Sequence, residues 1–108
     1  MPVNVKPKYK NCKAEIDGIV FDSKREAERY RKLKLMQFSG MISGLELQKE
    51  FELIPKQKGE RAVKYRCDFY YLKDGNPIVE DVKGMKTKDY IIKRKLMLFI
   101  HGIRVIEI

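Results

Sequence analysis

The chain has 108 residues, of which 44% are hydrophobic and 36% are charged, and its formal net charge is +9 at pH 7. This length fits one small domain over residues 1–108, and the hydrophobic content excludes a disordered chain. No apolar run reaches membrane-spanning length and residues 1–10 contain no signal-peptide core, so a cytoplasmic protein is expected. The positive charge favours a polyanionic partner, with nucleic acid ahead of an anionic membrane surface.

The first 13 residues, with two prolines and four lysines, predict a flexible basic arm that either contacts phosphates or is simply a frayed terminus. Cys12 and Cys67 have neither metal-ligand nor redox spacing, and His101 is the only histidine. Reduced thiols are therefore expected, and a zinc site is not.

Asp17-Gly18 lies between two short apolar runs and predicts a small peripheral hairpin over residues 14–21. A helix is predicted from Ser23 to about Gly40, because Ser23 and Glu26 have the spacing of a capping box, in which Glu26 returns a hydrogen bond to the Ser23 amide. The expected buried positions are Ala27, Tyr30, Leu33, Met36 and Phe38. The other face is basic and is either solvated or phosphate-facing; its residues are Lys24, Arg25, Arg29, Arg31, Lys32 and Lys34.

Glu26 has two possible roles. It is either the capping acid or a side chain that points into a cleft from the edge of the buried stripe. Local pattern alone favours the cap.

Three strand segments follow. Residues 45–53 read as one strand with an irregularity near Lys49-Glu50, and residues 62–72 and 78–83 form a hairpin around Asp74-Gly75. Counting outward from this turn pairs Asp68 with Asp81. Alternation then places an apolar row on the opposite, core-facing side; its members are Tyr65, Cys67, Phe69 and Tyr71. Glu80 falls on that core side, which the pattern does not explain.

Two carboxylates directly opposite each other destabilise a sheet, by about 4 kcal/mol at ~4 Å and an effective dielectric of ~20. A shared proton, the nearby Lys83 and Arg66, or a divalent cation would offset this repulsion. The alternatives are a solvated face on which the charges balance, or a slipped register or bulge that separates Asp68 from Asp81.

A second helix is predicted from Thr87 to about His101, ending at Gly102, and residues 104–108 alternate as a final strand. Its expected apolar positions are Tyr90, Ile91, Leu96, Met97, Leu98 and Ile100. The beginning of the helix is strongly basic and is expected to contact DNA phosphates; the residues concerned are Lys86, Lys88, Lys93, Arg94 and Lys95.

The order helix, three strands, helix, strand, with Asp68 and Asp81-Val82-Lys83 on adjacent strands, resembles the PD-(D/E)xK (restriction-endonuclease-like) nuclease superfamily. More closely, residues 21–28, 45–48 and 79–84 resemble a family of small phage and prophage proteins associated with Holliday junction resolvase or related endonuclease activity. The resemblance covers Lys13 to Ile108. It implies an α/β fold with an α-β-β-β-α-β core, in which helices flank a mixed central sheet, preceded here by the small hairpin.

The resemblance also implies roles for single residues. Asp68 and Asp81 match the metal-binding acids of the superfamily, Lys83 matches its lysine, and Glu26 matches an acid that many members carry on the first helix. Gln48 matches a glutamine often found on the first core strand, as an accessory residue. The chain departs from the pattern at Cys67, where a proline commonly precedes the first acid. Glu80 beside Asp81 leaves two candidate acids, and the spacing to Lys83 favours Asp81.

The activity implied is a metal-dependent DNA endonuclease that hydrolyses phosphodiester bonds, expected to act on Holliday junctions or other branched DNA. Mg²⁺ or Mn²⁺ on Glu26, Asp68 and Asp81 would activate water, Lys83 would orient it or neutralise the phosphate, and no small-molecule cofactor or membrane is expected. A junction resolvase should be a homodimer, and this resemblance places it in a bacterial host cell as a phage or prophage product. The alternatives are a non-catalytic DNA-binding accessory protein of phage replication or recombination that retains the fold, and a structural domain of a phage particle, which the charge disfavours.

Overall fold

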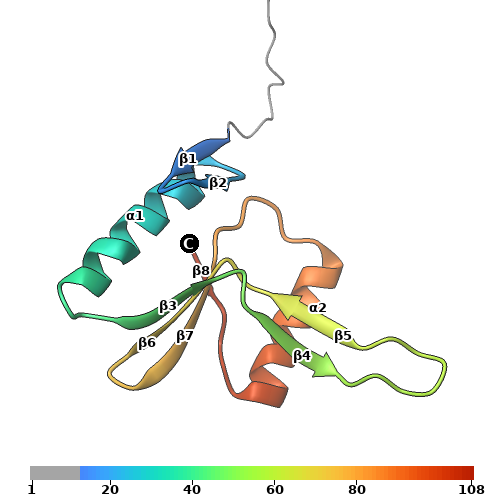
Figure 1. The fold of residues 1–108 in the computed structure, drawn as a ribbon. Coiled ribbons are helices and arrows are strands. Elements are labelled where there is room, and N and C mark those ends of the chain that lie inside the picture. Colours follow the sequence, from blue (N-terminus) through green and yellow to red (C-terminus); the bar gives the residue numbers. More distant parts are fainter. Residues whose placement is uncertain (1–12) are drawn as a thin grey trace, which may run out of the picture.

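A computed structural model describes residues 13–108, which form a mixed α/β fold (Figure 1). In chain order the elements are β1 (Ala14–Ile16), β2 (Ile19–Phe21), α1 (Lys24–Phe38), β3 (Ser43–Leu47), β4 (Glu50–Ile54), β5 (Val63–Arg66), β6 (Phe69–Lys73), β7 (Asn76–Asp81), α2 (Lys88–Leu96), the π-helix η1 (Met97–His101) and β8 (Ile106–Glu107). The predicted α/β class is confirmed. None of the helices in the described part of the chain is long and apolar enough to cross a membrane.

The central sheet has four strands in the order β3-β6-β7-β8. The pairs β3–β6 and β6–β7 are antiparallel, and β8 lies parallel to β7. β4 and β5 form a separate antiparallel ribbon that projects from the body of the molecule, and the hairpin β1–β2 lies at the beginning of α1 (Figure 1). α1 and α2 lie on opposite sides of the central sheet (Figure 1).

Two segments that the sequence predicts as single strands are each divided in two. In residues 45–53 the division lies next to the irregularity predicted near Lys49-Glu50, whereas the prediction of one uninterrupted strand over 62–72 is wrong. The first breaks at Gln48-Lys49, where Gln48 has a left-handed backbone with φ 57°, and the second breaks at Cys67-Asp68. The two breaks lie side by side, because Gln48 N donates to Asp68 O (3.2 Å) and Cys67 N donates to Lys49 O (3.0 Å). Both chain segments therefore bend at the same place, and beyond it β4 and β5 leave the central sheet as a separate ribbon.

The core consists of two clusters, one on each face of the sheet. Phe69 and Tyr71 pack with α1, whereas Tyr65 and Cys67 pack with Val79 and the second helical segment. The apolar row predicted from Tyr65 to Tyr71 is buried throughout, as expected, but its placement on one face is wrong. The break at Cys67-Asp68 sends its first half to the opposite face.

Ser23 caps α1 as predicted, because its Oγ accepts a hydrogen bond from Glu26 N at 3.1 Å. Within residues 13–108 the Glu26 carboxylate makes no return bond to the Ser23 amide, so the capping box is only half formed. Ala27, Tyr30 and Leu33 are buried as predicted. At the end of the helix Met36 is partly buried against this core, but Phe38 is 93% exposed, contrary to the prediction.

Thr87 caps α2 as predicted, its Oγ1 accepting from Tyr90 N at 3.1 Å, and Gly102 ends the helical segment in a left-handed conformation with φ 71°. The last five residues of the segment are a π-helix, which changes the buried face. Met97 is fully buried, but Leu98 and Ile100 are exposed, contrary to the predicted apolar stripe. The final strand exists but is shorter than predicted.

Glu80 is buried because it is bound by a charged partner from α1. Its carboxylate accepts two hydrogen bonds from the Arg29 guanidinium (2.8 and 2.6 Å) and one from the Tyr71 hydroxyl. The prediction that Arg29 belongs to a solvated or phosphate-facing surface is therefore wrong. The predicted basic arm falls on residues 1–13, of which only Lys13 lies within the described residues, where it pairs with Asp22 at 3.3 Å.

Candidate functional site

Asp68 and Asp81 meet at one end of the central sheet, as the sequence predicts. The β6–β7 register ends with Phe69 opposite Glu80, and Asp68 and Asp81 are the next residue on each side of that pair. Each aspartate accepts a backbone hydrogen bond from the other segment: Asp68 N donates to Asp81 Oδ1 (2.9 Å), and Val82 N donates to Asp68 Oδ2 (2.8 Å). These two bonds to charged oxygens hold the carboxylates together and offset part of their repulsion.

The second oxygen of Asp81 faces a tyrosine and a lysine. Asp81 Oδ2 accepts a hydrogen bond from the Tyr65 hydroxyl and lies 3.8 Å from Lys83 Nζ. The Lys83 ammonium also sits 4.3 Å from the centre of the Tyr90 ring, so a cation–π contact helps to position it. The motif lysine is thus held beside the motif acid, but Arg66, the other predicted neutralising residue, pairs in register with Glu50 on β4 instead.

Glu26 reaches the same end of the sheet from the first turn of α1 and is 91% buried. Burial above all, together with the charges of Asp68, Asp22 and Asp81, raises the pKa of Glu26 to about 7, against the lowering effect of Lys83. The charges of three other acids affect the pKa of Glu26 because these acids lie close to its carboxyl group. Of the two roles left open for Glu26, the structure therefore favours the side chain that points into the site.

Both aspartates also bind protons more tightly than usual. Burial raises the pKa of Asp81 to about 6, although the hydrogen bond from Tyr65 and the charge of Lys83 lower it. Burial likewise raises the pKa of Asp68, with the Val82 amide and Lys83 opposing. Perturbed carboxyl groups that cluster in one place are typical of functional sites.

Gln48, the predicted accessory residue, stands at the break between β3 and β4. Its side chain hydrogen-bonds Asp68 and lowers the pKa of that carboxyl. Gln48 lines the same cavity as Glu26 and Asp68. Gln48 is therefore part of the cluster.

The donor set suits a hard divalent cation, because carboxylate and amide oxygens are the ligands that Mg²⁺ and Mn²⁺ prefer. Within residues 13–108, however, no three His, Cys, Asp or Glu side chains stand in a finished metal-binding arrangement. Asp81 already uses both oxygens, whereas Asp68 Oδ1 and the Glu26 carboxylate accept from no backbone amide. The residues fit a cation that would relieve their mutual repulsion, and Glu26 and Asp68 are the ones ready to accept it.

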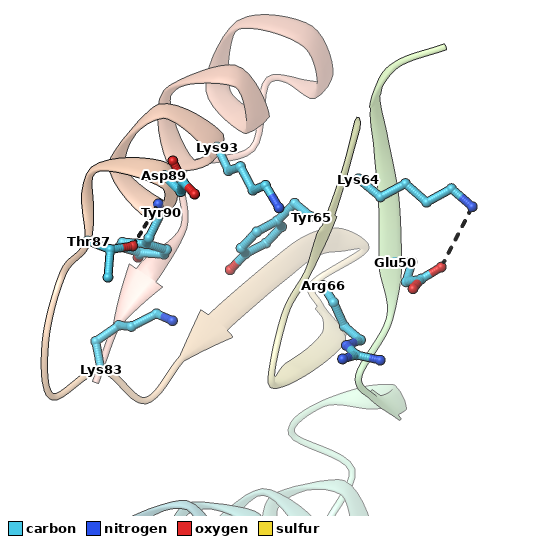
Figure 2. A pocket seen from close by; sticks show the side chains of 9 residues that line it. All are labelled: Glu50, Lys64, Tyr65, Arg66, Lys83, Thr87, Asp89, Tyr90 and Lys93. Atoms are coloured by element: carbon cyan, nitrogen blue, oxygen red, sulfur yellow. Dashed lines mark hydrogen bonds and ion pairs between the residues drawn. The ribbon is translucent and has the colours of Figure 1, made fainter. Parts of the chain in front are cut away.

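Two hollows open on either side of Asp81. A cavity of about 220 Å³ is lined by Asp22, Glu26, Gln48 and Asp68. A larger cavity of about 450 Å³ lies between the β4–β5 ribbon and the beginning of α2, with Tyr65 and Lys83 on its wall (Figure 2). Asp81 itself is buried but contacts residues of both, while Glu26 and Asp68 line the first hollow and Lys83 lines the second.

The basic residues predicted to contact DNA do not act as one group. Lys86 and Arg94 both bind Glu107, at 3.0 and 2.9 Å, and are thereby partly neutralised. Lys93 lines the larger cavity, whereas Lys88 and Lys95 are exposed outside it. Only Lys93 of the five stands next to the candidate site.

Sequence reasoning missed two members of the site. Tyr65 was assigned to the face away from the aspartates, and only the break at Cys67-Asp68 brings its hydroxyl to Asp81. Asp22 lines the smaller cavity and raises the pKa of Glu26. Its place directly before the helix cap at Ser23 was a usable signal, since Glu26 lies one turn further on; nothing in the sequence signalled Tyr65.

Replacing Tyr65 with Phe should weaken binding of Mg²⁺ or Mn²⁺ by about 10- to 100-fold, because the hydroxyl fixes one oxygen of Asp81. The metal dependence of the melting temperature measures this. Tyr71→Phe is the matched control, since it removes a similar hydrogen bond from buried Glu80 on the other face. Equal metal affinity in the two variants would contradict a positioning role for Tyr65.

A family model described as "Protein of unknown function (DUF1064)" matches residues 6–102. Neither a search of curated proteins nor a search of solved structures found a match.

Proposed function

We propose that this chain, which belongs to the DUF1064 family, is a metal-dependent endonuclease that hydrolyses phosphodiester bonds in DNA, with branched DNA such as a four-way junction as its substrate. One observation supports this most: Glu26, Asp68, Asp81 and Lys83 come from three separate segments of the chain to one end of the sheet. Hydrogen bonds within the protein hold Asp68 and Asp81 there, but they do not account for the approach of the buried Glu26 to the same acids. A core of the PD-(D/E)xK type, which the element order resembles, would use such a cluster for catalysis.

In this proposal Asp68 and Asp81 hold Mg²⁺ or Mn²⁺ together with Glu26, and the metal when bound lowers the pKa of water and stabilises charge on the scissile phosphate. Tyr65 fixes the orientation of Asp81 through its hydroxyl. Lys83, held over the Tyr90 ring, places a positive charge where the phosphate becomes more negative. Gln48 orients Asp68 from the opposite side.

The alternative, a DNA-binding accessory protein that does not cleave, is favoured by one observation. Both oxygens of Asp81 already accept hydrogen bonds within the protein, so the acids can be stable without a metal. Such a protein would bind DNA, and its affinity would be the same with Mg²⁺ and with EDTA.

Incubation of the purified protein with a labelled four-way DNA junction and with linear duplex of matching sequence tests the proposal. Cleavage of the junction with Mg²⁺ or Mn²⁺ and none with EDTA is expected. Paired cuts on opposite strands would further indicate a homodimer, which light scattering on the junction complex can check. Binding without cleavage under either metal would contradict the nuclease and support the accessory protein.

In metal-free buffer the protein should become less stable as the pH rises from about 5 to 8. Glu26 and Asp81 have pKa values of about 7 and about 6, raised from 4.5 and 3.8, so in this range the folded state holds protons that the unfolded state has released. Stability therefore falls with pH, by an amount that should lower the melting temperature by about 5–10 °C.

Mg²⁺ should restore the melting temperature at pH 8 and have little effect at pH 5, because only ionised carboxylates bind it. Glu26→Gln serves as the control, since it should remove a large part of the pH dependence without a metal. A melting temperature that rises over this range, or one that Mg²⁺ raises equally at both pH values, would contradict the prediction.

A further inference from the structure

The larger cavity, next to the acid cluster, is walled by several cations, only some of which have an ion-pair partner within residues 13–108. It lies between the ribbon strand β5 and the beginning of α2, and four of its lining residues are basic (Figure 2). Two of these, Arg66 and Lys93, form no ion pair within residues 13–108. Figure 2 shows the ammonium groups of Lys83 and Lys93 directed into the cavity near the Tyr65 ring, whereas Lys64 extends away from α2 toward Glu50. Positive charge is therefore concentrated on the inner wall.

The cavity is also connected to the candidate active site. Lys83 and Tyr65 line it, and both contact Asp81. A ligand group in the cavity would thus lie next to whatever the acids bind. At about 450 Å³ the cavity has the size of a small-ligand pocket, with room for about one or two nucleotides of a single strand but not for a duplex.

We propose that this cavity is the binding site for the backbone of one nucleic-acid strand, with Arg66 and Lys93 contacting phosphates next to the phosphate that faces Lys83. The inference rests on the proposed function for the nature of the ligand. The opposite walls that carry Arg66 and Lys93, on β5 and α2, would place one cation on each side of the strand. Asp89 and Glu50 also line the cavity and oppose binding of an anion, Glu50 less so because Lys64 pairs with it.

The test is the affinity of the full chain for a fluorescent DNA duplex and for its single strand in EDTA, over a series of salt concentrations. Arg66→Ala and Lys93→Ala should each weaken binding by about 5- to 10-fold and reduce the salt slope by about 1, as expected for one lost phosphate contact. Lys95→Ala is the matched control: it removes the same charge two residues further along α2, outside the cavity, and should change the affinity by less than about 2-fold.

A variant with the opposite expected sign guards against effects of misfolding. Asp89→Asn removes a negative charge from the cavity and should tighten binding by about 2- to 5-fold. Equal losses for Lys93→Ala and Lys95→Ala, no tightening by Asp89→Asn, or no binding by the unmodified chain would each overturn the inference.

The outcome separates this inference from the proposed function. Cavity-dependent binding without metal-dependent cleavage would support the strand site and contradict the nuclease. Metal-dependent cleavage with affinity unaffected by Arg66→Ala and Lys93→Ala would keep the nuclease and overturn the strand site.

Discussion

Asp81→Asn should abolish metal-dependent cleavage, lowering the rate by at least about 10³-fold, or roughly 4 kcal/mol of transition-state stabilisation. The residue contacts Asp68, Tyr65 and Lys83 and is almost completely buried. An asparagine has nearly the same shape, and its carbonyl oxygen can still accept the Asp68 amide hydrogen, so the fold should persist. What is lost is the negative charge that would bind the metal in the proposed mechanism. Cleavage of labelled DNA under saturating metal measures the effect.

Asp68→Asn should have an effect of similar size, because Asp68 is the acid with an oxygen still available for a metal. The control is Asp74→Asn, which makes the same chemical change in the β6–β7 turn, where the positive φ of 52° suits Asn. Asp74→Asn should cleave like the unmodified protein. Cleavage by Asp81→Asn at more than about a tenth of the normal rate would contradict a catalytic role for this acid.

The part of this site that the sequence predicted follows from one turn. Asp74-Gly75 fixes the register of β6 and β7, whose last pair, Phe69 and Glu80, places Asp68 next to Asp81. Likewise, the cap at Ser23 fixes the beginning of α1 and so places Glu26 in its first turn. Turn and cap signals can predict the positions of these acids because they depend only on residues close in sequence.

What the sequence did not predict depends on contacts between distant segments. The breaks at Gln48-Lys49 and Cys67-Asp68 stabilise each other through backbone hydrogen bonds, and neither segment contains a glycine or proline to mark its break. The sequence indicated only an irregularity near the first break, at Lys49-Glu50, and the second segment was interpreted as uninterrupted, which put Tyr65 on the wrong face. The sequence did not explain a charged Glu80 on the core side for a related reason, because its partner Arg29 lies 51 residues away on α1.

Arg29→Ala should destabilise the protein by about 3–5 kcal/mol, the usual cost of leaving a buried charge without its partner. Glu80 is 1% exposed, and Arg29 supplies two of its three hydrogen bonds. Glu80→Ala should cost less, because the remaining guanidinium is about a quarter exposed and can be solvated. Urea unfolding of both variants measures the two values.

The double variant Arg29→Met/Glu80→Leu should lose much less than the sum of the two single alanine variants, since it removes both charges and leaves apolar groups in their place. The result bears on the active site, because Arg29 lies one turn after Glu26 on α1 and Glu80 directly precedes Asp81 on β7. The ion pair thus fixes α1 against the strand that carries the acids. If the costs were additive, the apolar cluster alone would hold α1, and the position of Glu26 would not depend on Glu80.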